Sequence, residues 1–139
     1  MLSVVNLAVK RLLFGSALLT WMGVIFVFSH QPGSGGNWQP PLWYVLERKS
    51  AHVVEYAMLM GLSSLFFRAL FPHERREKVM LVAFLFTCTY GLADEIHQSF
   101  VFGRGAKFSD ALIDAAGAML MGILLSVWRP RWLERLQNI

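Results

Sequence analysis

Ionisable side chains stand near one end of three apolar segments of the chain. They form three groups, which are Lys49, His52 and Glu55, then Asp94, Glu95 and His97, and then Asp110 and Asp114. A charge placed in hydrocarbon costs about 2.5–3.5 kcal/mol even on lenient insertion scales, and an intramembrane charge therefore indicates a functional site by default. We expect one polar site that three helices share at a single membrane level.

Helical geometry sorts these residues into faces, at about 100° per residue. Near residues 49–56, one face carries Lys49, His52 and Tyr56, with Glu55 at its edge. Further along, one face carries Tyr90, Asp94, His97 and Gln98, with Glu95 turned away from it, and another carries Asp110, Asp114 and Gly117. Each helix is therefore predicted to present one polar stripe, confined to one end.

A metal site is one use of these residue types, because histidines and carboxylates on facing helices are common metal ligands. His52 with Glu55, and Asp94 with His97, stand three residues apart and could chelate a divalent cation. Their order matches no metalloenzyme signature, so the presence of a metal stays open at this point.

Acid–base chemistry without a metal is a second use. His52 or His97 would pair with a carboxylate, while Arg104 or Lys49 would hold an anionic group such as a lipid-linked phosphate. The third interpretation is structural, with ion pairs that only lock the helix ends together. Those pairs would join Glu55, Asp94 and Asp110 to Lys49, Arg104 and Lys107.

The composition is that of a membrane protein. Of the 139 residues, 55% are hydrophobic and 16% are charged, whereas soluble domains carry about 25% charged residues. This length accommodates one domain with spans of about 20 residues each, which we place at 12–28, 50–70, 79–98 and 109–128. The net charge of +4 lies beside the apolar runs and forms no stripe that would track nucleic acid. The predicted fold is an all-α integral membrane bundle of four helices.

Basic residues predict the orientation of this bundle through the positive-inside rule. The segments that we place in the cytoplasm carry Lys10, Arg11, Arg68, Arg75, Arg76, Lys78, Arg129, Arg131 and Arg135. Both termini are then inside, and loops 30–49 and 99–108 lie outside the cytoplasmic membrane with Arg48, Lys49, Arg104 and Lys107. The polar helix ends consequently face the extracytoplasmic side.

Several further features refine this scheme. Pro72 and Pro130 are expected to end the second and fourth spans, because proline cannot continue a helix without losing a hydrogen bond. The first outer loop, which includes Trp38, is rich in Gly, Pro and Trp, and would lie over the helix ends as a lid or serve as an interfacial anchor. Residues 131–136 resemble an interfacial amphipathic turn.

Three motifs resemble those of VanZ-like membrane proteins. Residues 49–56, Lys-Ser-Ala-His-Val-Val-Glu-Tyr, resemble the first, and residues 90–104, with their Asp-Glu, Gln and Gly-Arg elements, resemble the second. Asp110, Asp114 and Gly117 resemble the third. The combined pattern extends over residues 49–122. Phe102 stands where this family often has proline, and Asp114 stands where asparagine is frequent.

The resemblance implies an integral membrane protein of short helices. The founding member of the family is associated with low-level resistance to teicoplanin, a lipoglycopeptide that acts on cell-wall precursors at the outer face. A link to glycopeptide resistance is thus an expectation for this chain, but the resemblance supplies no reaction. It agrees with the outward-facing site that the charge bias predicts.

We therefore predict an outward-facing site that acts on, or binds, the headgroup of an envelope lipid or wall precursor. A membrane-embedded hydrolase or transferase on a phosphate-containing lipid would fit. Its chemistry would rest on His52, Glu55, Asp94, His97, Arg104, Asp110 and Asp114, and its binding on Lys49, Tyr56, Tyr90, Glu95, Gln98 and Lys107. In this scheme Asp94 and Glu55 act as base or ligand, Arg104 clamps an anion and His97 shuttles protons. The alternative is a non-catalytic protein whose charged cluster is an interhelical network, and the oligomeric state stays open.

Overall fold

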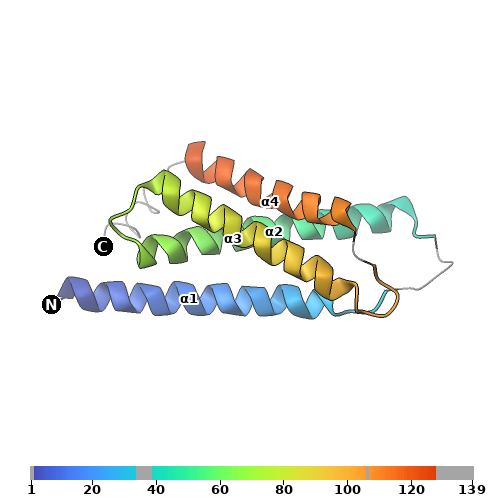
Figure 1. Ribbon diagram of the computed structural model, residues 1–139, viewed down its shortest axis with the longest axis horizontal. Helices are drawn as coiled ribbons and strands as arrows, with labels where there is room; N and C mark the ends of the chain where they lie inside the picture. The colour runs from blue at the N-terminus through green and yellow to red at the C-terminus, as the bar shows by residue number, and fades with distance from the viewer. Residues whose placement is uncertain (1, 34–38, 106, 128–139) are drawn as a thin grey trace.

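The four regular elements of the described chain are all α-helices. The computed structural model describes residues 2–33, 39–105 and 107–127. Helix α1 spans Leu2–Ser29, α2 spans Leu42–Leu70, α3 spans Arg76–Gln98 and α4 spans Phe108–Val127. Successive helices run in opposite directions, so the end of α1, the start of α2, the end of α3 and the start of α4 meet at one end of the bundle (Figure 1). The predicted all-α bundle is confirmed, and the polar helix ends share one level.

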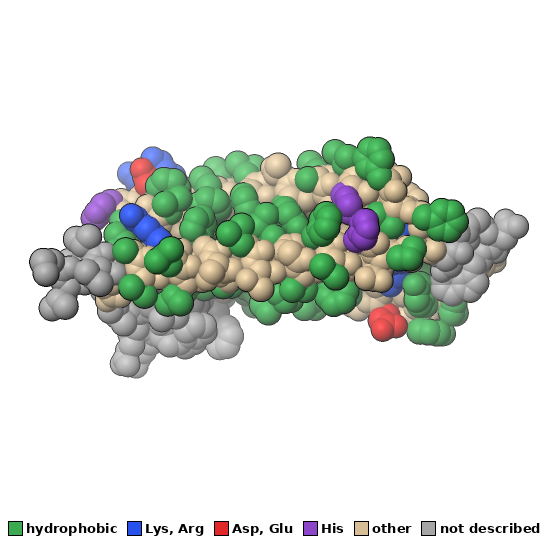
Figure 2. Space-filling model, turned by 90° about the horizontal axis from the view of Figure 1, so that it is seen from below, with side chains coloured by type: hydrophobic (Ala, Val, Ile, Leu, Met, Phe, Trp, Pro, Cys, Tyr) green, Lys and Arg blue, Asp and Glu red, His purple; other side chains and the backbone are tan. Residues whose placement is uncertain are grey.

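The surface of the bundle suits a membrane. Each of the four helices is long and apolar enough to cross a bilayer, and large hydrophobic side chains such as Leu19, Leu85 and Leu120 are exposed on their outer faces. Charged side chains gather toward the two ends of the molecule, and hydrophobic side chains cover its middle (Figure 2). We conclude that the chain is a multi-pass membrane protein. The placement of both termini inside remains a prediction from charge.

Two helices begin earlier than the sequence predicted, α1 at Leu2 instead of residue 12 and α2 at Leu42 instead of residue 50. Hydropathy marks only the apolar part of a helix, whereas residues 42–49 mix apolar and charged side chains, of which the leucine, glutamate, arginine and lysine residues favour helix. Pro41 precedes α2 with φ −63°, a conformation that suits the start of a helix. The added turns of α2 carry Tyr44 and Arg48 to the polar end.

The other predicted boundaries are closer to the observed ones. Helix α2 ends at Leu70, before Pro72 as expected, while α3 begins at Arg76 instead of residue 79. The predictions for Trp38, for Pro130, for the amphipathic segment 131–136 and for the basic residues beyond 127 lie outside the described residues.

Helix α2 is the centre of the packing, because it contacts the three other helices and lies most extensively against α4. At its polar half, buried Tyr56 and Leu59 pack with Ile25 of α1. On the side of α3 and α4, Met60 packs with Ala118. Helix α1 packs on α2 and more lightly on α3, so α1 and α4 lie on opposite sides of the central helix (Figure 1).

The backbones of α4 and α2 approach each other closely at Gly117 and Val53. A Cβ atom at Gly117 would overlap the carbonyl oxygen of Val53. The two helices can come this close only because residue 117 has no side chain. Since His52 and Asp114 stand beside this contact, one and three residues away along their helices, it also sets the separation of those two side chains.

Candidate functional site

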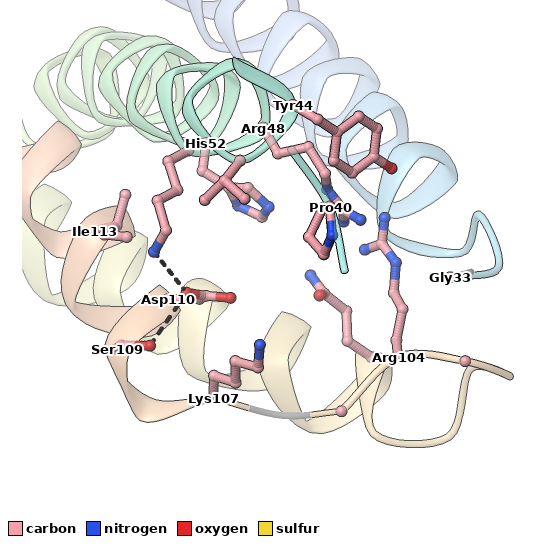
Figure 3. A pocket seen from close by; sticks show the side chains of 15 residues that line it. Gly33, Pro40, Tyr44, Arg48, His52, Arg104, Lys107, Ser109, Asp110 and Ile113 are labelled. Atoms are coloured by element: carbon pink, nitrogen blue, oxygen red, sulfur yellow. Dashed lines mark hydrogen bonds and ion pairs between the residues drawn. The ribbon is translucent and has the colours of Figure 1, made fainter. Parts of the chain in front are cut away.

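A cavity of about 480 Å³ opens at the polar end of the bundle. Its walls come from the starts of α2 and α4 and from the segment that follows α3 (Figure 3). The side chains that line it and were predicted as site residues are Lys49, His52, Gln98, Arg104, Lys107 and Asp110. Tyr44, Arg48, Ser109 and Ile113 line it as well. Part of the predicted site therefore lines this cavity, together with residues that were not predicted.

A histidine–aspartate pair joins α2 to α4 at this cavity. His52 Nδ1 lies 3.1 Å from Asp114 Oδ1, and the Asp114 side chain is only 1% exposed. An ionised carboxylate only accepts hydrogen bonds, so we assign the proton to Nδ1, which leaves Nε2 as a basic nitrogen. His52 lines the cavity and makes no Nε2 hydrogen bond to a described residue. A carboxylate that orients an imidazole in this way prepares it for proton transfer.

Polar contacts also fix the start of α4. Lys49 Nζ lies 3.4 Å from Asp110 Oδ1, which also accepts a hydrogen bond of 3.2 Å from the Ser109 hydroxyl (Figure 3). From α3, Glu95 Oε2 accepts a hydrogen bond of 3.0 Å from the backbone N–H of Lys107. The Lys49–Asp110 pair is part-exposed, where an ion pair contributes about 0–1 kcal/mol. Of the predicted structural pairings, this is the one that the described residues contain.

A separate polar row connects α3 to α1. Asp94 is buried, and its Oδ2 accepts hydrogen bonds of 2.7 Å from the Ser29 hydroxyl and 2.8 Å from the Gln98 amide. One turn before Asp94 in α3, the Tyr90 hydroxyl donates a hydrogen bond to the Met22 carbonyl of α1. Near the end of α3, the His97 ring faces the His30 ring, with 3.2 Å between their nearest nitrogens. The common face predicted for Tyr90, Asp94, His97 and Gln98 is confirmed, with Glu95 turned toward α4. This face packs against α1 instead of lining the cavity, except at Gln98.

Replacing Asp94 with asparagine is expected to destabilise the protein by about 1–3 kcal/mol. Both partners of Oδ2 are donors, and asparagine would offer them a neutral amide oxygen in place of the carboxylate, which weakens two charge-assisted hydrogen bonds. Thermal unfolding of the purified protein in one detergent measures the change. Glu55→Gln is the control, because the Glu55 carboxylate makes no hydrogen bond or ion pair to a described residue. An unchanged midpoint for Asp94→Asn would contradict this role for Asp94.

The other predicted site residues do not line the cavity, and they lie either inside the bundle or on its surface. Tyr56 is fully buried, stacks on the His52 ring at a centroid distance of 6.5 Å, and has no hydrogen-bond partner for its hydroxyl among the described residues. Glu55 is half-buried near His52. His97 lies outside the cavity, beside His30 and Phe26. Of the two predicted site histidines, His52 is the one that lines the cavity.

Two glycines join the loops at the polar end of the bundle and place Arg104. The Gly33 N–H donates a hydrogen bond of 2.9 Å to the Phe102 carbonyl, and Gly103 has a φ of 72°, which favours glycine. The next residue, Arg104, donates to the Phe28 carbonyl at 3.3 Å, and its Nε is buried without a partner among the described residues. Burial and the neighbouring Arg48 guanidinium lower the pKa of Arg104, which stays a cation near neutral pH.

Gly33→Ala is expected to loosen the segment after α3, because a Cβ at position 33 would overlap the Gly103 carbonyl. Hydrogen–deuterium exchange of a peptide covering residues 99–105 should become faster, while peptides from the helix centres should be unchanged. Gly105→Ala is the matched control, since a Cβ there meets nothing within 4 Å. Equal exchange in the two variants would show that the Gly33–Gly103 contact does not hold the segment.

The residues of the proposed chelating pairs form hydrogen bonds with other partners. Among the described residues, no group of three or more His, Cys, Asp or Glu side chains has metal-binding geometry. His52 pairs with Asp114 instead of Glu55, and Asp94 pairs with Ser29 instead of His97. The arrangement favours the acid–base interpretation over the metal one.

Three residues at the polar end of the bundle were not predicted as site residues, although the sequence contains a pattern that marks them. Arg48 was counted only for topology, yet it stands one residue before Lys49 on a helix that continues through it. Ser29 and His30 end an apolar run and were given no role, although they meet the polar face of α3. A polar residue at the end of each helix, including α1, is the pattern that would have found them.

Comparison with known proteins gives the family. The sequence model of the VanZ/LLP1 family matches residues 14–129, which include all the residues that line the cavity. No curated protein and no solved structure matches the chain. The family match covers most of the 139 residues, and it agrees with the three motifs. This multi-pass membrane protein belongs to the VanZ/LLP1 family.

Proposed function

We propose that the protein binds the headgroup of an envelope lipid or wall precursor in the polar cavity and acts on it by general acid–base chemistry. The observation that carries the proposal is the combination of basic walls with the His52–Asp114 pair at one opening. Arg48, Lys49, Arg104 and Lys107 provide those walls. An anion is the complementary ligand, and headgroups carry their charge at the level where the spanning helices end.

The orientation is part of this proposal. Basic residues such as Lys10, Arg75 and Lys78 cluster at the end of the bundle opposite the cavity. The positive-inside rule places that end in the cytoplasm. The cavity then opens at the extracytoplasmic face of the cytoplasmic membrane, where lipid-linked wall precursors are used. The partners of the protein are accordingly membrane lipids and a headgroup at the outer surface.

His52 is the residue that we place at the centre of the chemistry. Its Nε2 accepts the proton of an attacking water or hydroxyl group while Asp114 stabilises the imidazolium that forms. The new P–O bond forms as the bond to the leaving oxygen breaks, and the imidazolium returns the proton to that oxygen. Arg104 and its basic neighbours neutralise the phosphoryl oxygens. The reaction is then hydrolysis or transfer on a phosphate-containing lipid.

Mass spectrometry of envelope lipids and wall precursors tests the proposal. The comparison is between cells that make the protein and cells that make none, grown to the same density. A species that appears or vanishes only when the protein is present supports chemistry and identifies the headgroup. Identical profiles would contradict the enzymatic role.

Binding without reaction is the second candidate, and the Lys49–Asp110 pair and the hydrogen-bonded Asp94 favour it. Such contacts would also occur in a structural network that presents a rigid surface to a precursor. In that case, any change in teicoplanin susceptibility that the protein causes should persist in His52→Gln at equal membrane levels. If the protein is an enzyme, that change should disappear in the variant. Minimum inhibitory concentrations separate these two cases.

A further inference from the structure

Two arginines face each other in the cavity. Arg48 extends from α2 and Arg104 extends from the segment after α3, and their guanidinium groups approach one another beside Tyr44 (Figure 3). Each side chain is half-buried. Neither forms an ion pair with a carboxylate of the described chain. The hydrogen bond of Arg104 goes to a neutral backbone carbonyl, that of Phe28.

This arrangement is unfavourable without a ligand. Like charges repel, and partial burial weakens the screening by water. The cost is visible in the pKa of Arg104, which burial and the Arg48 charge lower. Asp110, the carboxylate on the cavity wall, is already paired with Lys49 on the opposite side. The Arg48–Arg104 pair thus retains unused hydrogen-bonding capacity, including the buried Arg104 Nε.

We propose that Arg48 and Arg104 together bind a phosphoryl group with two or more negative charges, as in a phosphomonoester or a diphosphate. This inference rests on the proposed function and specifies the ligand of the same site. The planar guanidinium presents paired N–H donors that match phosphoryl oxygens in a bidentate manner.

The charge of the wall selects the ligand class further. Among the described residues, four basic side chains and one carboxylate line the cavity and leave an excess of three positive charges. A carboxylate or a phosphodiester carries one negative charge and would leave most of that excess uncompensated. A phosphomonoester or a diphosphate carries about two or three near neutral pH. Lys107, which also lines the cavity, would neutralise the remaining charge, because Lys49 is paired with Asp110.

Titration calorimetry with inorganic pyrophosphate tests this subsite. The full-length protein is placed in nanodiscs of phosphatidylcholine, and acetate serves as the monovalent comparison. Pyrophosphate should bind, acetate should not, and Arg48→Gln should raise the pyrophosphate dissociation constant by about 10- to 100-fold, as expected for the loss of charge-assisted hydrogen bonds. Arg48→Lys keeps the positive charge but not the paired N–H donors of the guanidinium, and it should show a smaller loss of pyrophosphate affinity. Arg75→Gln removes an exposed arginine beyond the opposite end of the bundle and should bind as the wild type does.

A second experiment distinguishes a lipid phosphate from a soluble phosphate compound as the ligand. Nanodiscs that contain phosphatidic acid should weaken pyrophosphate binding if the ligand is a lipid phosphomonoester, whereas unchanged binding assigns the subsite to a soluble phosphate compound. No pyrophosphate binding by the wild type, or equal binding by Arg48→Gln and Arg75→Gln, would overturn the subsite. If the lipid profile still depends on the protein in that case, the proposed function stands with a different ligand class. If the lipid profile is also the same with and without the protein, both the subsite and the proposed function are contradicted.

Discussion

Cells that make His52→Gln are expected to convert the headgroup at least about 100-fold more slowly than cells that make the wild type. A positioned general acid–base group contributes about 10²–10⁴-fold to a rate. Glutamine has a similar reach and can form one hydrogen bond to Asp114, but it does not exchange a proton near neutral pH. The measurement is the rate at which the identified species appears or disappears, normalised to protein in the membrane.

The matched control for this prediction is His30→Gln. His30 is the same residue type at the same end of the bundle, but it is exposed and does not line the cavity. We expect His30→Gln to keep most of the conversion. If both variants lose activity equally, the effect comes from a general disturbance of that end of the bundle. If neither loses activity, His52 is not the proton-transfer group.

The sequence was sufficient to predict the fold because two patterns in it agree, namely the long apolar runs and the helical spacing of the polar residues. Long apolar runs require helices in a bilayer, since every backbone polar group must be satisfied within the segment. The periodicity of Tyr90, Asp94 and Gln98 predicted a common face, and that face exists. What periodicity could not provide is the partner across the face. Ser29 is a short polar residue at the end of a span, and nothing local distinguishes it from an ordinary helix terminus.

The site was harder to predict than the fold, because two of its determinants are not local. Arg48 reaches the cavity because α2 begins at Leu42, above the apolar run that hydropathy detects. Arg104 reaches it because Gly33 and Gly103 allow two loops to touch, although they are 70 residues apart in the chain. A distance between loops depends on the tertiary packing of all four helices. The residue types were therefore predictable, whereas their division between the cavity and the α1–α3 contact was not.

Gly117→Ala is expected to lower the free energy of unfolding by about 1–3 kcal/mol, which is the usual cost of forcing an added group into a packed interior. The new methyl group would overlap the Val53 carbonyl oxygen, and backbone atoms cannot move aside as a side chain can. Helices α2 and α4, the most extensive contact of the bundle, would have to separate. Thermal unfolding in a fixed detergent measures the loss.

The same substitution should also reduce activity, because the displaced helices carry His52 and Asp114, whose 3.1 Å contact is made one turn above Gly117. Gly23→Ala is the matched control, since a Cβ there meets nothing within 4 Å and alanine favours helix over glycine by up to about 1 kcal/mol. We expect this control to be as stable as the wild type or slightly more stable. If Gly117→Ala unfolds at the wild-type midpoint, the backbones of α2 and α4 are not in contact at this position. If it is destabilised but fully active, the histidine–aspartate geometry does not depend on that contact.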